Sequence, residues 1–218
     1  MNNEKLVLLA LDMDDNLCDT NAFINDSLIS HFKRKGQLDR VNQVKELALQ
    51  MSTFLYPEDL RELIWELVIK PGHFMRQAVP TELATGTLFS KLRQLANGSN
   101  NRLKVVVCTH RGFHEHAWSN TKYWLGLHVT PGLITNIHAI KSGEYPNKLD
   151  FLQQMYPEYE IILLDDNPFH DKTKVYEHDP RVVIYDQINR FDTYSAQRTY
   201  RGPTDLANHI ANKLGLYF

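Results

Sequence analysis

The sequence predicts an α/β fold in which a doubly wound, Rossmann-like parallel sheet is covered by helices. Two observations support this prediction. Four short runs of consecutive apolar residues are typical of strands that are buried on both faces. Stretches with helical periodicity separate these runs, and such alternation is typical of parallel sheets. The length of 218 residues accommodates one domain of this kind with a small insertion.

Each predicted strand ends at a polar residue. The strands, with the residue that follows each of them, are 6–11 (Asp12), 103–108 (Thr109), 161–164 (Asp165) and 181–185 (Asp186). Between them, the spacing of leucines predicts one helix over 83–95 and another over 149–155, which Pro157 ends.

Residues 20–80 break the alternation, because they contain no convincing strand. Three helices are predicted there instead, over 21–35, 41–55 and 57–69, with Pro-Gly after the last. The sequence therefore predicts two parts. Residues 1–19 and 80–218 form an α/β core domain, and residues 20–79 form a helical insertion after strand one.

Composition excludes several classes of partner. The formal net charge of -2 gives no broad attraction to a phosphate backbone, so we expect no nucleic-acid polymer as a partner. The two cysteines, Cys18 and Cys108, form no disulfide framework, and so low a count is typical of a reducing cytoplasm. No apolar run reaches the length of a membrane span or resembles a signal segment. We expect a cytoplasmic protein without membrane contact, and a homodimer stays open as an alternative to a monomer.

Polar side chains gather at the carboxyl ends of the predicted strands, where open parallel sheets bind ligands. The candidates are Asp12, Asp14, Asp15, Thr109, His110, Arg111, Lys148, Asp165, Asp166 and Asn167. Crowded carboxylates resist ionisation, and a cation that prefers oxygen ligands, such as Mg²⁺, relieves their repulsion. One carboxylate can act as a nucleophile towards phosphorus, a second can transfer protons, and a hydroxyl and an ammonium group can hold phosphoryl oxygens. The set predicts magnesium-dependent phosphoryl transfer.

These residues resemble, in order and spacing, motifs I to IV of the haloacid dehalogenase superfamily. The matching positions are Asp12-Met13-Asp14, Thr109, Lys148 and Asp165-Asp166. The insertion falls where that superfamily places a type-1 helical cap, so we call residues 20–79 the cap.

The resemblance implies a role for each motif. Asp12 would be the nucleophile and a metal ligand, and Asp14 the general acid/base, which binds the metal through its backbone carbonyl. Thr109 and Lys148 would bind phosphate. Asp165 would bind the metal with Asp166 in support.

One departure from the family concerns Asp15 and Asn16, which stand where the superfamily usually has Gly followed by Thr or Val. Asp and Asn are the residues that best tolerate the backbone shapes open to glycine. The extra carboxylate adds negative charge to the site, so a degenerate chain that binds a ligand without turnover is an alternative. A phospho-accepting receiver switch fits less well. In such a switch the paired acids come first along the chain, whereas here the acidic pair comes last.

A closer resemblance is to the 5'(3')-deoxyribonucleotidases and their bacterial and phage relatives. The matching stretches are Pro71-Gly72-His73-Phe74 with Val79-Pro80, the aromatic helix 118–126, Ile184-Tyr185-Asp186-Gln187 and Arg201-Gly202-Pro203. This resemblance implies a nucleoside monophosphate as substrate, with another small phosphate ester as the alternative. Phe54, Tyr56, Trp65 and Phe74 are the cap aromatics. For Phe74, stacking on a base and packing in the cap's own small core are both open, whereas we expect Trp65 to pack inside the cap.

Four further interpretations concern histidines, cysteines and lysines. His110 and Arg111 directly follow Thr109, so we expect them to contact the substrate anion. A zinc site built on His110, His114 and His116 is disfavoured, because no other ligand joins them at a typical spacing. The two cysteines are expected to pack in the core. Lys148 is preferred over Lys141 for the phosphate because it opens the helix before the third predicted strand.

Overall fold

The computed structural model describes residues 5–141, 143–166, 179–185 and 198–216. Asn167, Asp186 and Gln187, which the sequence singled out, lie outside the described residues. The strands form a single sheet in the order β3-β2-β1-β4-β5-β6, and every pairing is parallel. Their bounds are β1 Val7–Leu11, β2 Leu103–Thr109, β3 Ile134–Ala139, β4 Glu160–Asp165, β5 Val182–Ile184 and β6 Arg198–Thr199.

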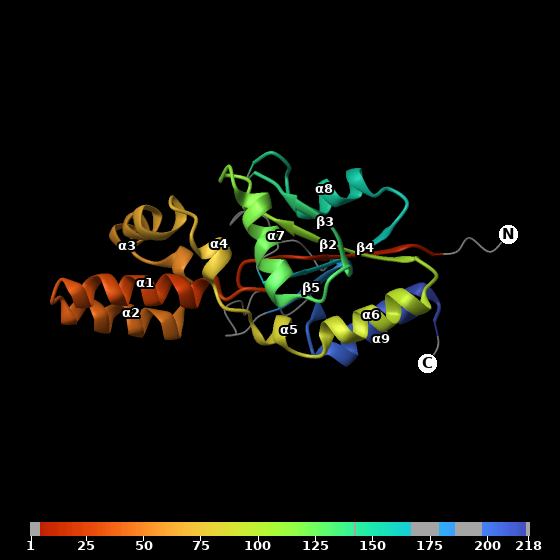
Figure 1. Ribbon diagram of the computed structural model, residues 1–218, viewed down its shortest axis with the longest axis horizontal. Coiled ribbons are helices and arrows are strands. Elements are labelled where there is room, and N and C mark those ends of the chain that lie inside the picture. The colour runs from red at the N-terminus through yellow and green to blue at the C-terminus, as the bar shows by residue number, and fades with distance from the viewer. Residues whose placement is uncertain (1–4, 142, 167–178, 186–197, 217–218) are drawn as a thin grey trace.

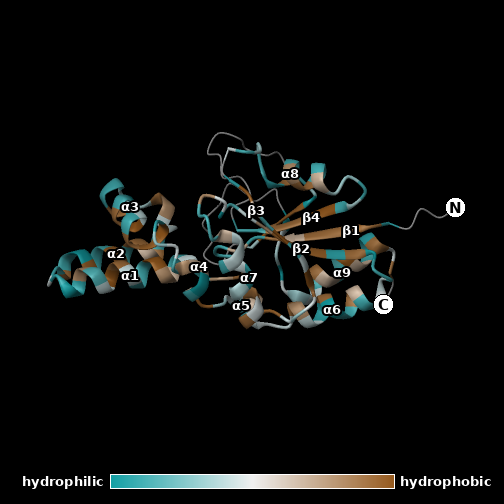
Figure 2. Cartoon of the chain, turned by 45° about the horizontal axis from the view of Figure 1, so that its top comes forward, coloured by the Kyte–Doolittle hydropathy of each residue, from teal (hydrophilic) through white to brown (hydrophobic). Residues whose placement is uncertain are grey.

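The strand β1 lies at the centre of the sheet and is buried along its whole length. Val7 pairs with Leu103 of β2 on one side and with Glu160 of β4 on the other. Both faces of β1 are covered, which explains why its sequence, VLLAL, is apolar without alternation. Figure 2 shows the central strands β1 and β2 among the most hydrophobic parts of the chain.

Helices cover the two faces of the sheet unequally. On one face lie α5 (Glu82–Thr85), α6 (Leu88–Gly98), α7 (Ala117–His128) and α9 (Pro203–Leu214). On the other face lies α8 (Lys148–Met155), against alternate residues of β1, β2 and β4. Figure 1 shows the sheet between these two layers. The predicted doubly wound α/β fold with a helical insertion after strand one is confirmed.

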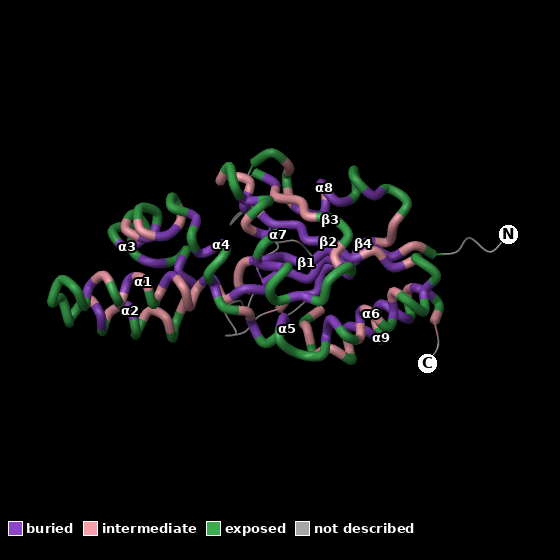
Figure 3. The backbone as a smooth tube through the Cα atoms, in the orientation of Figure 1, coloured by how far each residue is buried: buried purple, intermediate pink, exposed green. Residues whose placement is uncertain are grey.

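The cap lies at one end of the molecule, beyond the sheet (Figure 1). Its elements are α1 (Thr20–Arg34), α2 (Leu38–Gln50), the short 3-10 helix η1 (Thr53–Leu55), α3 (Glu58–Ile64), the π-helical turn η2 (Trp65–Ile69) and α4 (Phe74–Gln77). Their inward faces form an apolar cluster of their own, which includes Leu28, Val44 and Leu60. Figure 3 shows these buried stripes facing one another. The exact division at 19/20 and 79/80 stays a prediction.

The chain passes between the core and the cap twice, and the two connecting segments are hydrogen-bonded to each other. Cys18 and Pro80 form a β-bridge, and the backbone N–H of Asp19 donates to the carbonyl of Val79 at 2.8 Å. The indole of Trp124 in α7 donates to the carbonyl of Ala78 at 2.7 Å. The base of the cap is therefore fixed to the core by hydrogen bonds to the backbone carbonyls of Ala78 and Val79.

Several sequence predictions of elements were wrong. The strand β3 and the helix α9 were missed, and the helix expected over 83–95 is divided at Gly86 into α5 and α6. The helix expected over 41–55 ends at Gln50. Trp65 does not pack inside the cap, since it is 49% exposed. None of the helices in the described part of the chain combines the length and the apolar composition that crossing a membrane requires.

Candidate active site

Five of the predicted site residues meet at the carboxyl end of the sheet. Asp12 follows β1, Thr109 ends β2, Asp165 ends β4 and Asp166 follows it, and all of them are buried. The ammonium nitrogen of Lys148 lies 2.8 Å from Asp12 Oδ1 and 2.6 Å from Asp165 Oδ2. Lys148 thus bridges the carboxylates of two neighbouring strands.

The start of α8 places Lys148 at this position. The side chain of Asn147 caps the helix by accepting a hydrogen bond from the backbone N–H of Asp150 at 2.9 Å. Lys148 is therefore the first residue of α8 and is only 3% exposed. Lys141, the competing candidate, is exposed and does not line the cavity described below.

The carboxylates of Asp12, Asp165 and Asp166 form a candidate metal centre. One ligand oxygen from each can lie within 4.8 Å of the other two. Burial raises the pKa of Asp12 to about 7; the charge of Lys148 opposes this rise, and the charges of Asp165 and Asp14 add to it. An all-oxygen set of buried acids suits Mg²⁺, because the cation offsets the repulsion that burial intensifies. The residues present therefore fit the predicted cofactor.

The hydroxyl of Thr109 is the candidate hydrogen-bond donor to a bound phosphate. It is buried, it lines the cavity beside Asp12, and among the described residues it has no hydrogen-bond partner. A buried hydroxyl without a partner carries a desolvation cost that a bound ligand can remove. This is the environment expected for a group that binds a phosphoryl oxygen.

Asp14 is held by Arg111 and Thr20. Arg111 donates to it twice, from Nε to Oδ2 at 2.9 Å and from Nη2 to Oδ1 at 2.6 Å, and the hydroxyl of Thr20 donates to Oδ1 at 2.6 Å. Burial alone would raise the pKa of Asp14, but the charge and hydrogen bonds of Arg111, with the hydrogen bond of Thr20, lower it overall. Asp14 is an ionised, oriented carboxylate in this arrangement.

Arg111 lies behind Asp14 and not at the cavity surface. It is fully buried, it donates to Thr121 at 3.3 Å, and its guanidinium lies 5.3 Å from the ring centroid of Phe74. It is absent from the cavity lining, whereas His110 is part of it. The structure therefore brings His110 to the cavity but makes Arg111 a partner of the second acid.

A cavity of about 230 Å³ connects these groups to the cap. Its core side is formed by Asp12, Asp14, Asp15, Thr109, His110, Phe113, Lys148 and Asp166, and its cap side by Thr20, Ser52, Thr53, Phe54, Ile69 and Phe74. One region is thus acidic and polar, and another is aromatic. Phe113, Ser52 and Thr53 were not predicted, because no motif or spacing distinguishes them in the sequence.

Aromatic side chains from both parts of the chain lie at this cavity. Phe113 of the core is 47% exposed, and its ring centroid lies 6.4 Å from that of Trp65 in the cap. Phe54 is partly exposed, while Phe74 is buried. Flat apolar faces therefore remain accessible to a ligand at the cavity.

Of the remaining candidate residues, His114 and the two cysteines are packed against other parts of the protein. His114 packs against Gly72, and within the described residues the acidic triad is the one group of metal-ligand type, so no histidine zinc cluster forms there. Cys18 and Cys108 are buried, and burial raises the pKa of each thiol to about 12. Both cysteines are packed in apolar clusters, as expected.

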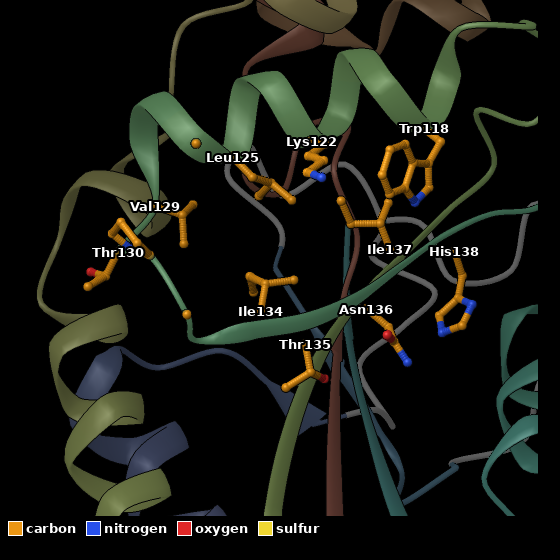
Figure 4. Close-up of a pocket in the computed structure, with 13 residues that line it drawn as sticks. Trp118, Lys122, Leu125, Val129, Thr130, Ile134, Thr135, Asn136, Ile137 and His138 are labelled. Atoms are coloured by element: carbon orange, nitrogen blue, oxygen red, sulfur yellow. The ribbon is translucent and has the colours of Figure 1, made fainter.

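A second cavity, of about 550 Å³, lies between α7 and the edge strand β3 (Figure 4). Trp118, Lys122 and Leu125 extend from the helix towards Ile134 and Ile137 of the strand. None of the predicted site residues lines this cavity. It is separate from the acidic cluster.

Comparison with solved structures identifies the fold as that of haloacid dehalogenase-like hydrolases, which confirms the resemblance at the level of fold. A haloacid dehalogenase-like hydrolase from Streptococcus pneumoniae shares 13% identity over 94% of this chain and 98% of its own, with a TM-score of 0.54. A family hydrolase from Deinococcus radiodurans with bound phosphate and sodium shares 13% identity over 97% of both chains, with a TM-score of 0.54. A candidate phosphoglycolate phosphatase from Lactobacillus delbrueckii subsp. bulgaricus shares 11% over 95% and 98%, with a TM-score of 0.56. No protein-family model and no curated protein matches the sequence.

Proposed function

We propose that this chain is a magnesium-dependent phosphomonoester hydrolase that forms an aspartyl-phosphate on Asp12. The observation that supports this most directly is the grouping, at one cavity, of a buried carboxylate, a bridging lysine and a hydroxyl that has no hydrogen-bond partner among the described residues. Asp12, Lys148 and Thr109 are these three groups. Together they provide a nucleophile and two donors for the oxygens of the attacked phosphoryl group.

The proposed reaction has two steps. A carboxylate oxygen of Asp12 attacks phosphorus, and the bond to the ester oxygen breaks. Asp14, which Arg111 and Thr20 keep ionised in the free site, first takes up a proton from solvent when the substrate binds and then gives that proton to the leaving oxygen. Asp14 then accepts a proton from water, which attacks the phosphoryl group and releases inorganic phosphate and free Asp12. Mg²⁺, when held by Asp12, Asp165 and Asp166, would offset negative charge on the phosphoryl group.

The proposed substrate is a nucleoside monophosphate, and residues 20–79 are proposed to act as the cap that contacts its organic part. A nucleobase needs a flat apolar surface, and aromatic rings provide one. The exposed rings of Phe54 and Phe113 supply such faces at the cavity that also holds Asp12, while Phe74 lines the cavity from within the apolar cluster of the cap. A sugar phosphate without a base would use these rings less.

A panel of phosphate esters tests both parts of the proposal. Deoxy- and ribonucleoside 5'- and 3'-monophosphates and sugar phosphates are assayed for phosphate release, with Mg²⁺ and with a chelator. We expect hydrolysis only with Mg²⁺, a preference for nucleotides, and no turnover by Asp12→Asn. Hydrolysis by Asp12→Asn would reject the nucleophile, and equal rates on nucleotides and sugar phosphates would reject the nucleotide.

An aromatic substitution refines the choice of substrate. Phe113→Ala should raise the KM for nucleoside monophosphates about tenfold, which corresponds to the loss of one stacking contact. The KM for a sugar phosphate should stay nearly unchanged. Trp118→Ala is the matched control, since Trp118 is an equally exposed aromatic residue that lies outside this cavity.

A second candidate function is ligand binding without turnover. The observation that favours it is the engagement of Asp14 by Arg111 and Thr20, which holds the carboxylate in place. Many turnovers on p-nitrophenyl phosphate would support the enzyme. Saturable binding of inorganic phosphate with no turnover on any ester would support the binding protein.

A further inference from the structure

We infer that Asn21, held by Asp15, is a positioning residue that fixes the cap segment Ser52–Phe54 at the active-site cavity and thereby sets affinity for the organic part of the substrate. This inference deepens the proposed function and rests on it for its kinetic test. It starts from Asp15, a residue whose backbone conformation is unusual.

Asp15 has a φ of 57°, in the left-handed region that non-glycine residues rarely adopt. Its backbone N–H donates to the carbonyl of Cys18 at 2.8 Å, which closes the turn after β1. An aspartate in this conformation costs stability relative to glycine. Its side chain should therefore have contacts that offset the cost.

The side chain of Asp15 accepts two hydrogen bonds from a single residue of the cap. The backbone N–H of Asn21 donates to Oδ1 at 2.7 Å, and the side-chain amide of Asn21 donates to Oδ2. The backbone amide lies in the first turn of α1, where an acidic group also interacts favourably with the helix dipole. Both oxygens of the added carboxylate are thus used to hold Asn21.

The remaining polar atom of Asn21 is directed to η1. Its Oδ1 accepts hydrogen bonds from the backbone N–H of Thr53 at 2.9 Å, from the Thr53 hydroxyl at 2.7 Å and from the Ser52 hydroxyl at 3.2 Å. Ser52 and Thr53 are almost fully buried. The amide of Asn21 therefore connects the turn that carries the nucleophile to a segment 31 residues further along the chain.

This connection matters because η1 forms part of the cavity. Ser52, Thr53 and Phe54 line it together with Asp12. A shift of η1 would move the cap side of the cavity and leave the carboxylates in place. Loss of the Asn21 amide should therefore weaken binding of the organic group and spare the chemical step.

The chain offers a matched control one helical turn away. Asn25, also in α1, accepts a hydrogen bond from the hydroxyl of Tyr56 at 2.8 Å, so it too ties α1 to the residues around η1. Tyr56 is buried in the apolar cluster of the cap and does not line the cavity. Asn25→Ala loosens the cap in a comparable way without releasing Ser52 or Thr53.

The kinetic test compares Asn21→Ala, Asp15→Gly, Asp15→Asn and Asn25→Ala on the best nucleotide of the panel. We expect Asn21→Ala and Asp15→Gly to raise KM about tenfold and to change kcat less than about twofold. Asp15→Gly suits the left-handed backbone, so its effect reports the lost carboxylate. Asp15→Asn keeps one acceptor and should show a smaller rise, and the double variant Asp15→Gly/Asn21→Ala should be no worse than either single variant.

A structural readout separates failure of this inference from failure of the proposed function. Hydrogen exchange of the Thr53 amide should become faster in Asn21→Ala and Asp15→Gly and stay unchanged in Asn25→Ala. If no substrate is hydrolysed, this exchange pattern still tests whether Asp15 and Asn21 hold the segment Ser52–Phe54 in place. An unchanged KM in Asn21→Ala, an equal rise in Asn25→Ala, or unchanged exchange at Thr53 would overturn the inference.

Discussion

Arg111 donates two hydrogen bonds to Asp14, one 2.9 Å and the other 2.6 Å long, and so holds the expected acid/base from the core side. The planar guanidinium fork makes this two-point contact, which a lysine cannot reproduce. The pair is asymmetric, because Arg111 is fully buried while the Asp14 side chain is 30% exposed. This relationship leads to the first prediction.

Arg111→Met should destabilise the fold by about 3 kcal/mol and lower kcat at least about tenfold, since removing one member of a buried pair leaves the other uncompensated. Arg111→Lys should restore part of the stability but little of kcat. Denaturant unfolding and steady-state kinetics measure the two effects. Arg76→Lys is the control, because Arg76 is exposed and contacts only the ring of Tyr123 among the aromatic residues described. An active Arg111→Met would show that Asp14 needs no such partner.

Lys148→Met should lower kcat by a factor on the order of 100 to 1,000, the effect of removing one preorganised charge from a reaction that develops negative charge. The substitution also leaves Asp12 and Asp165 without the ammonium that bridges them. Added Mg²⁺ should therefore raise the melting temperature of this variant more than that of the wild type. Lys141→Met should behave like the wild type in both assays. A comparable loss of kcat in Lys141→Met would show that the phosphate role had been assigned wrongly to Lys148.

Gly72→Ala should destabilise the protein by about 1–2 kcal/mol, the cost of a left-handed backbone for a residue with a Cβ atom. Gly72 has a φ of +70°, and a Cβ atom there would lie 2.5 Å from Nε2 of His114. For the control variant, the predicted change in stability has the opposite sign. Gly126 lies inside α7 with open space at its Cβ position, so Gly126→Ala should stabilise the protein by about 1 kcal/mol. Thermal or denaturant unfolding of the two variants provides the comparison.

The stability of the fold should decrease as the pH falls through 6.5, the ordinary pKa of histidine, partly because of His138. Burial lowers the pKa of this ring, which shares a hydrogen bond of 2.8 Å with the hydroxyl of Tyr156. The unfolded chain therefore binds the proton first as the pH falls, and protonation favours unfolding. His138→Gln should lose less stability than the wild type between about pH 7.5 and 5.5. Parallel pH profiles for the two proteins would contradict this assignment.

Strands buried on both faces were predictable because they leave a local signature. The segments around β1, β2 and β4 are continuous apolar runs. Because the carboxyl ends of parallel strands lie at one edge of the sheet, the sequence also predicted that Asp12, Thr109 and Asp165 lie close together. The strand β3 has no such signature, because it lies at the edge of the described sheet and exposes Thr135 and Asn136. An edge strand pairs on one side only, so its sequence is freer to be polar.

The cap side of the cavity could not be predicted for a different reason. Phe113 and Trp65 meet only because the cap docks on the core, and no spacing along the chain encodes that contact. The direction in which a long side chain points is equally difficult to predict from the sequence. Arg111 follows Thr109 by two residues, as a substrate-binding residue would, yet its guanidinium points inward to Asp14.

The position of β1 has a consequence for the order of folding. Val7 pairs with Leu103 and Glu160, so the central strand must wait for segments that are synthesised roughly 100 and 150 residues later. The helices of the cap, by contrast, make contacts between neighbouring segments, and their early formation would shorten the loop that β1 and β2 have to close. Until then the apolar sequence of β1 is an unpaired edge, a target for chaperones on the ribosome and for aggregation in refolding experiments. Of the strands described, the one made first is paired on both sides only after β4 has been made, and therefore later than β2.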